Sequence, residues 1–190
     1  MIGYAMCGSF CTHKASLVEL ERIVSGGADV VPIMSEIVYT TSTRFGEASR
    51  LIERVEEICG RRVIHTIVDA EPLGPRSPLD ILVVAPCTGN TLSKIARGVT
   101  DTAATMALKA HLRSDRPTLI ALATNDAMSQ NLANLAAVLS RKSVYFVPML
   151  QDSPVGKPHS LVAEFELIPR AVEAMISGEQ LRPIFLTASS

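Results

Sequence analysis

The sequence ILVVAPCTGNT, residues 81–91, joins an apolar run of strand length to a small polar turn. Its first four residues predict a buried strand, and the pattern after Thr91 predicts a helix. Backbone N–H groups in the first turn of a helix have no partner within the helix, so they attract anions. Together with the side chains of Thr88, Asn90 and Thr91, they predict a phosphate-sized anion site at the edge of a parallel sheet.

Apolar runs of strand length alternate along the chain with amphipathic stretches of helical period. This alternation predicts an α/β protein built from βαβ units around a parallel sheet. The expected strands are residues 2–6, 30–34, 63–67, 81–85, 118–123 and 144–147. The expected helices are residues 13–25, 45–58, 91–96, 102–113, 128–141 and 167–177. Residues 71–78 are rich in proline and predict a surface connection or a wall of the ligand site, and residues 148–160 predict a mobile loop or a lid.

The composition is that of an ordinary globular protein. The 190 residues are 47% hydrophobic and carry a formal net charge of -1, which predicts one substantial core in a single domain over residues 1–190. The basic residues are scattered, so no nucleic acid partner is expected. The apolar runs are too short for a membrane span and the N-terminus lacks a signal-peptide pattern, so we expect a cytosolic protein with reduced thiols.

Turns that follow parallel strands meet at the carboxyl edge of a sheet, where ligands bind. The turns that begin at Cys7, Ser35, Pro86 and Thr124 are therefore expected to converge. This convergence predicts a ligand crevice assembled from four separate parts of the chain.

Three features of these turns have two interpretations each. The Gly8-Ser9 pair either makes only a tight turn or brings backbone and a hydroxyl group to a phosphate. Asn125 either caps the next helix or offers its amide to a substrate carboxylate or a flavin ring. Cys87 either only shapes the turn by its packing or is a reactive thiolate at a helix N-terminus.

No motif in the sequence identifies a general base. HExxH, the P-loop pattern and a Ser-His-Asp arrangement are absent, and Cys7, Cys11 and His13 match no common zinc spacing. We therefore expect no metal site. The chemistry is expected to come from a cofactor or from a partner chain.

Four stretches resemble motifs of one family of flavoproteins. They are residues 8–15 (GSFCTHKA), 85–91 (APCTGNT), 92–101 (LSKIARGVTD) and 125–128 (NDAM). The family includes phosphopantothenoylcysteine decarboxylase, lantibiotic cysteine decarboxylases and flavin prenyltransferases. The resemblance implies a three-layer α/β/α Rossmann-like sandwich with a six-stranded parallel sheet, in homo-oligomers that bind FMN between subunits.

The same resemblance implies roles for residues of the turns. Ser35 would approach the isoalloxazine ring of FMN, and Asn125 would face that ring as the candidate catalytic residue. The other residues implied to bind the cofactor are Gly8, Ser9, Phe10, Pro86, Cys87, Thr88, Asn90 and Thr91.

Further stretches resemble one branch of the family, the B subunits of a synthase of endospore-forming bacteria that makes a cyclic dicarboxylate. They are residues 121–129 (ALATNDAMS), 145–148 (YFVP), 151–155 (QDSPV) and 157–163 (KPHSLVA). The branch implies an A subunit that carries NADP. The histidine that cysteine decarboxylases carry shortly before the aspartate ahead of their fourth strand is absent before Asp80, which argues against decarboxylation. Two alternatives stay open, a stand-alone FMN-dependent decarboxylase or prenyltransferase, and a non-catalytic scaffold subunit that binds a dicarboxylate or phosphate.

Overall fold

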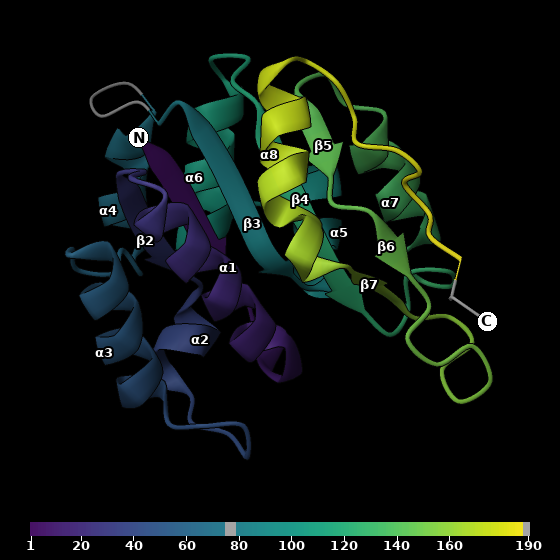
Figure 1. Ribbon diagram of the computed structural model, residues 1–190, viewed down its shortest axis with the longest axis horizontal. Coiled ribbons are helices and arrows are strands. Elements are labelled where there is room, and N and C mark those ends of the chain that lie inside the picture. Colours follow the sequence, from purple (N-terminus) through teal and green to yellow (C-terminus); the bar gives the residue numbers. More distant parts are fainter. Residues whose placement is uncertain (75–78, 188–190) are drawn as a thin grey trace.

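The computed structural model describes residues 1–74 and 79–187, and its central feature is a mostly parallel sheet (Figure 1). Five strands run parallel in the order β2-β1-β3-β4-β5. Their bounds are β1 Ile2–Met6, β2 Val30–Met34, β3 Ile81–Cys87, β4 Thr118–Thr124 and β5 Val144–Phe146. Pro32 lies in β2, which is an edge strand, the position where a sheet tolerates a residue without an N–H group.

Helices cover both faces of the sheet, so the expected three-layer fold is confirmed. One face packs against α1 (His13–Ser25), α3 (Ala48–Cys59) and α8 (Ile168–Ile176), and the other against α5 (Gly89–Arg97), α6 (Ala103–Leu112) and α7 (Leu132–Leu139). Successive strand side chains point to opposite faces. Within β3, Val83 belongs to the core under α1, and Val84 belongs to the core under α5. No helix in the described part of the chain is long and apolar enough to cross a membrane.

Two short antiparallel strands extend the sheet beside the carboxyl end of β4. They are β6 (Met149–Leu150) and β7 (Leu161–Ala163), with Thr124 opposite Leu161, and they bring the sheet to seven strands. The expected loop over residues 148–160 therefore begins with a strand. The rest of that segment is held by Asp152, which accepts hydrogen bonds from the Lys157 ammonium and the Ser160 hydroxyl.

The expected strand over residues 63–67 is wrong. Ile64 alone pairs, in a parallel bridge to Ile33, and the chain turns directly into α4 (Ile67–Ala70). The Thr66 hydroxyl accepts the Asp69 N–H at 3.1 Å, so a side-chain cap starts a helix where the apolar pattern predicts a strand.

One other expectation needs correction. The sequence predicts Phe45 on a helix. In the structure this residue lies between α2 (Glu36–Thr40) and α3, in a turn closed by the Thr43–Gly46 bridge, and it is 54% exposed. The proline-rich segment 71–78, expected to be a surface connection or a wall of the ligand site, begins with a 3-10 helix at Glu71–Leu73. Residues 75–78 lie outside the described part of the chain.

Candidate ligand-binding site

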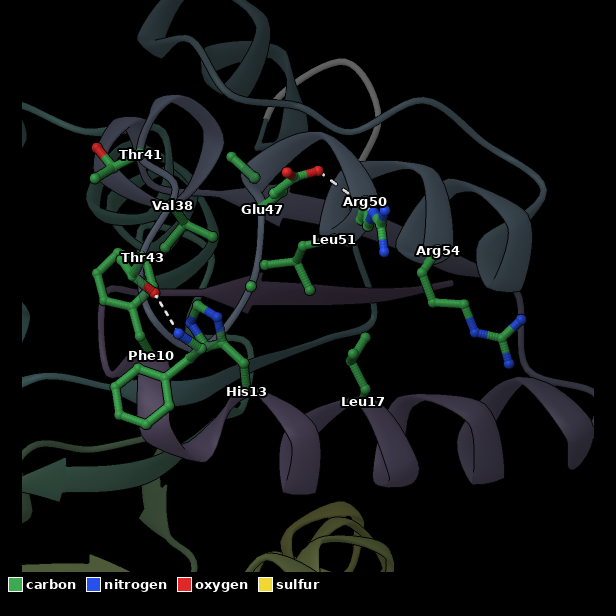
Figure 2. A pocket seen from close by; sticks show the side chains of 13 residues that line it. Phe10, His13, Leu17, Val38, Thr41, Thr43, Glu47, Arg50, Leu51 and Arg54 are labelled. Carbon is green, nitrogen blue, oxygen red and sulfur yellow. Dashed lines mark hydrogen bonds and ion pairs between the residues drawn. The ribbon is translucent and has the colours of Figure 1, made fainter.

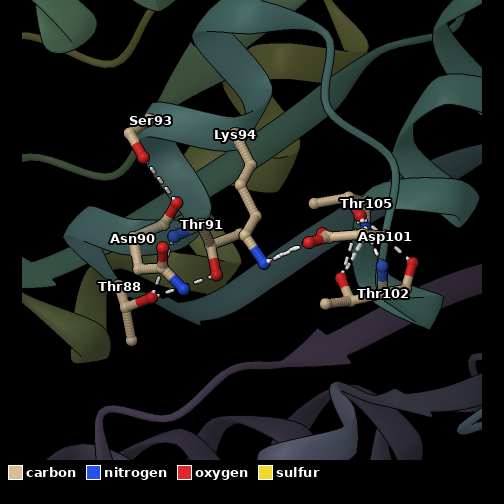
Figure 3. Close-up of polar contacts among 8 residues, drawn as sticks. All are labelled: Thr88, Asn90, Thr91, Ser93, Lys94, Asp101, Thr102 and Thr105. Atoms are coloured by element: carbon tan, nitrogen blue, oxygen red, sulfur yellow. Dashed lines mark hydrogen bonds and ion pairs between the residues drawn. The ribbon is translucent and has the colours of Figure 1, made fainter.

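The polar turn after β3 starts α5 with a side-chain cap (Figure 3). The Thr88 hydroxyl oxygen accepts the Thr91 N–H at 3.1 Å, and the same hydroxyl donates to Thr91 Oγ1 at 3.0 Å. Gly89 and Asn90 occupy the first turn of the helix, where N–H groups have no partner within the helix. The start of α5 therefore has N–H donors available, and their binding of an anion stays a prediction.

A cavity of about 500 Å³ lies beside this helix start. Three of the four expected turns contribute to it, because β1, β2 and β3 are neighbours in the sheet and end at the same edge. Its lining residues are Gly8, Ser35, Glu36, Ile37, Thr40, Thr88, Asn90, Thr91, Lys94, Asp101 and Thr102. Five of the nine predicted cofactor contacts are thus brought together, namely Gly8, Ser35, Thr88, Asn90 and Thr91.

Ser35 is the most informative residue of the lining. Its side chain is 5% exposed, and its hydroxyl oxygen is buried without a hydrogen-bond partner in the described part of the chain. It stands at the start of α2, but its side chain makes no capping hydrogen bond. Because a buried polar atom without a partner costs about 1–3 kcal/mol, a polar ligand atom would remove that cost.

The cavity also contains an ion pair that the sequence does not single out. Lys94 Nζ lies 2.8 Å from Asp101 Oδ1, with side-chain exposures of 21% and 54% (Figure 3). The hydrogen bond from Lys94 lowers the pKa of Asp101 below its ordinary value. Glu36, Thr40 and Thr102 also line the cavity without having been predicted. Residues 94 and 101 lie in a family-like motif, but their spacing alone does not predict that they meet.

Gly89 fits tightly against the turn that follows β4. A Cβ atom at Gly89 would lie 2.5 Å from Thr124 Oγ1, 2.6 Å from Asn131 Nδ2 and 2.8 Å from Asp126 Oδ1. The Asp126 carboxylate accepts hydrogen bonds from the Thr124 hydroxyl at 2.6 Å and from the Asn131 amide at 2.9 Å. This polar network fixes the position of the α5 start, and nothing in the sequence beyond the polar residue types indicates it.

Five predicted site residues do not line this cavity, and three of them, Asn125, Ser9 and Phe10, lie in turns or short helices outside it. Asn125 lies exposed in the turn after β4, next to the Asp126 network. Ser9 precedes a short 3-10 helix, and its hydroxyl lies 4.0 Å from Cys11 Sγ. Phe10 lines a second hollow of about 240 Å³, where Figure 2 shows it beside His13. Their cofactor or catalytic roles stay predictions.

The second hollow lies between α1 and α3. In Figure 2, Leu17 extends from α1 and Leu51 from α3, with Thr43 and Val38 at one end. His13 is turned inward, with Nε2 2.9 Å from the Cys7 carbonyl oxygen, and burial lowers its pKa below the ordinary value. Burial therefore favours the neutral form of this side chain.

Pro86 and Cys87 lie in β3, two residues beyond the expected end of the strand. Cys87 pairs with Leu122 of β4 and is fully buried. Burial raises the pKa of its thiol well above the ordinary value. The reactive-thiolate interpretation of Cys87 is therefore wrong, because the strand places the thiol in the core and the helix begins only after Thr88.

We expect a thiol reagent to distinguish these cysteines in the native protein. Cys11 is exposed and should react rapidly, whereas Cys7 and Cys87 should react only after unfolding, because both are buried and burial raises the pKa of Cys7 to about 11. Timed labelling followed by mass spectrometry of the peptides measures this order. Cys11→Ser should remove the fast phase, and rapid labelling of Cys87 in folded protein would contradict the assignment.

The sheet, its helical layers and the polar cavity at the carboxyl ends of the strands define a flavoprotein-type α/β protein. The chain belongs to the Flavoprotein family, whose model matches residues 2–166. It is similar to the B subunit of dipicolinate synthase of Bacillus subtilis (strain 168), with 42% identity over 185 residues, 97% of this chain and 92% of that protein. The expected branch of the family is thereby confirmed.

Solved structures agree with this assignment. A crystal structure of the dipicolinate synthase B subunit from Bacillus halodurans C is 40% identical, covers 99% of this chain and 96% of its own, and superposes with a TM-score of 0.91. The FMN-dependent cysteine decarboxylase SpaF shares the fold at 20% identity, with a TM-score of 0.67 over 93% of this chain and 95% of its own.

Proposed function

We propose that this chain is the B subunit of a two-subunit dipicolinate synthase. It acts with an A subunit that carries NADP, and the pair forms dipicolinate from a dihydrodipicolinate-level precursor in the mother cell of a sporulating bacterium. The observation that carries the proposal is the 42% identity to the B subunit of a dipicolinate synthase over nearly the whole of both chains. It is tested by measuring dipicolinate formation with and without this chain.

The proposed reaction is an oxidation that makes a dihydro ring aromatic. The NADP of the A subunit would supply the two-electron oxidant for this step: it would accept one ring hydrogen as a hydride, and the second hydrogen would leave as a proton to solvent. The dicarboxylate product keeps both carboxylates. The part assigned to this chain is to bind and orient an anionic group, for which the α5 start and the cavity beside it supply N–H and hydroxyl donors.

The cavity residues fit a flavin phosphate as well as a carboxylate. The Ser35 hydroxyl lacks a partner among the described residues, and the first turn of α5 points free N–H groups outward. Thr88, Asn90 and Thr91 would hold the phosphate region, and Ser35 would meet a polar edge of the cofactor. When bound, FMN would supply two-electron redox chemistry.

Two alternative functions require different observations. A stand-alone FMN-dependent decarboxylase or prenyltransferase must turn over without a partner, and freshly purified protein must show flavin absorbance. SpaF, an FMN-dependent cysteine decarboxylase, is only 20% identical to this chain, so the likeness shows a common fold alone. A non-catalytic scaffold subunit must bind a dicarboxylate or phosphate and order its partner, and this alternative is rejected if replacing Asn125 or Thr88 leaves binding intact but abolishes turnover.

Asn90→Ala is expected to weaken binding of FMN or phosphate. One lost hydrogen bond to a charged group costs about 1.5–3 kcal/mol, which corresponds to roughly a 10- to 150-fold higher dissociation constant. Fluorescence titration with FMN and calorimetry with phosphate measure the constant. Ser93→Ala is the matched control, because Ser93 lies on the same helix outside the cavity lining and should bind as the wild type does. An unchanged constant in Asn90→Ala would reject the assignment.

A further inference from the structure

The charges of the cavity are arranged unusually for an anion site. Among the described lining residues, Lys94 is positive, whereas Glu36 and Asp101 are negative. The positive charge is already paired, since Lys94 Nζ contacts both Asp101 carboxylate oxygens, at 2.8 and 2.9 Å. An anion that enters the cavity therefore meets a cation that is occupied by a carboxylate of the same chain.

The position of Lys94 allows it to reach such an anion. Thr88, Thr91 and Lys94 follow one another at spacings of three residues, so they share one face of the start of α5. Helical side chains lean toward the N-terminus of their helix. Figure 3 shows the Lys94 ammonium group between Thr91 and Asp101.

Asp101 is held by a separate structure. It precedes Thr102, which caps α6 in a reciprocal capping box with Thr105 (Figure 3). This box fixes the loop between α5 and α6, so Asp101 stays in place while the longer Lys94 side chain can change its direction. Because Asp101 is more than half exposed, water screens the ion pair and keeps it weak.

We propose that Lys94 is the counter-charge for the anionic group of the ligand and that Asp101 competes with the ligand for it. In the empty protein Lys94 pairs with Asp101; when a phosphate or carboxylate binds at the start of α5, Lys94 turns to it and Asp101 is released to solvent. The inference rests on the proposed anion-binding role of the cavity. Because an anion must displace Asp101 from Lys94, this competition lowers the affinity of the cavity for anions.

A purely structural ion pair between α5 and the following loop predicts something else. In that case, removing either charge would slightly lower the free energy of unfolding. Any effect of the Asp101 substitution on anion affinity would be the same whether or not Lys94 is present. A double-mutant cycle separates the two interpretations, because competition requires the effect of Asp101 to depend on Lys94.

The experiment compares wild type, Lys94→Met, Asp101→Asn and the double variant, with inorganic phosphate and FMN as probes in separate titrations. Lys94→Met is expected to weaken binding about tenfold or more, as for a lost charged hydrogen bond. Asp101→Asn is expected to tighten binding about two- to fivefold, the range of a weak ion pair. In the Lys94→Met background the gain from Asp101→Asn should fall by at least half. Thermal unfolding of each variant checks that the fold is intact.

The exposed Lys142–Asp115 pair, with 3.0 Å between Nζ and Oδ2, supplies the control. Lys142→Met and Asp115→Asn make the same charge changes away from the cavity and should leave affinity within twofold of the wild type. An equal gain from Asp101→Asn in both backgrounds overturns the proposal, as does a failure of all four proteins to bind either probe at millimolar concentration. The proposed synthase function fails separately, if dipicolinate formation with the A subunit does not depend on this chain.

Discussion

Replacing Leu92 by alanine is expected to lower the free energy of unfolding by about 2–5 kcal/mol. Leu92 lies on the inner face of α5, fully buried in the core that contains Val84 and Ile120 of the sheet. Truncation removes buried apolar area and leaves a cavity beneath the helix whose first turn borders the candidate ligand site. Chemical denaturation at equilibrium measures the loss, and phosphate titration below the transition reports whether the site survives.

Leu132→Ala is the matched control for this substitution. Leu132 begins α7 and is 53% exposed, so the same truncation removes little buried area. Its cost is expected to stay below about 1 kcal/mol, as for surface positions. Equal losses in the two variants would contradict the packing of α5 against the sheet.

Gly89→Ala is expected to cost about 1–3 kcal/mol, as for overpacking, and to weaken phosphate binding as well. The added methyl group would overlap Thr124 Oγ1 and Asn131 Nδ2, at 2.5 and 2.6 Å. Relief of the overlap requires either the Asp126 network to open or the start of α5 to move. Both changes displace the N–H groups of the first turn of α5, which would face an anion in the proposed site. Denaturation and phosphate titration of one protein preparation measure the two effects together.

Gly26→Ala is the control that tests whether the loss of phosphate affinity is specific to a methyl group at position 89. Gly26 follows α1 with φ near -73°, and a Cβ atom there would come no closer than 3.3 Å to its nearest neighbour. We expect a smaller loss of stability and unchanged phosphate affinity. If Gly89→Ala behaves like Gly26→Ala, the close fit between α5 and the β4 turn is not as described.

Local sequence patterns predict much of this molecule. The helix expected over residues 13–25 agrees with α1 at both ends, because its apolar spacing is regular and Gly26-Gly27 follow it. The small polar residues at 88, 90 and 91 predict an anion site, and Ser35 joins them because parallel strands end at one edge. These features depend on residues close together in the chain or on the general rule for parallel sheets.

Features that depend on long-range contacts are not predictable in the same way. The apolar pattern ends β3 two residues early because Pro86 interrupts it, whereas pairing of Cys87 with Leu122 continues the strand. The strand β6 has only two residues, too few to show the alternating apolar pattern from which a strand is predicted. Lys94 and Asp101 lie seven residues apart, and only the fold of the loop between α5 and α6 makes them meet.

Dipicolinate formation by the reconstituted pair is the decisive measurement for the proposed function. The A subunit is assayed at fixed NADP and dihydrodipicolinate-level precursor, alone, with this chain, and with this chain after heat denaturation. We predict that dipicolinate forms faster with the native chain than in either other mixture. The same rate from the A subunit alone would contradict the assignment of this chain to the synthase.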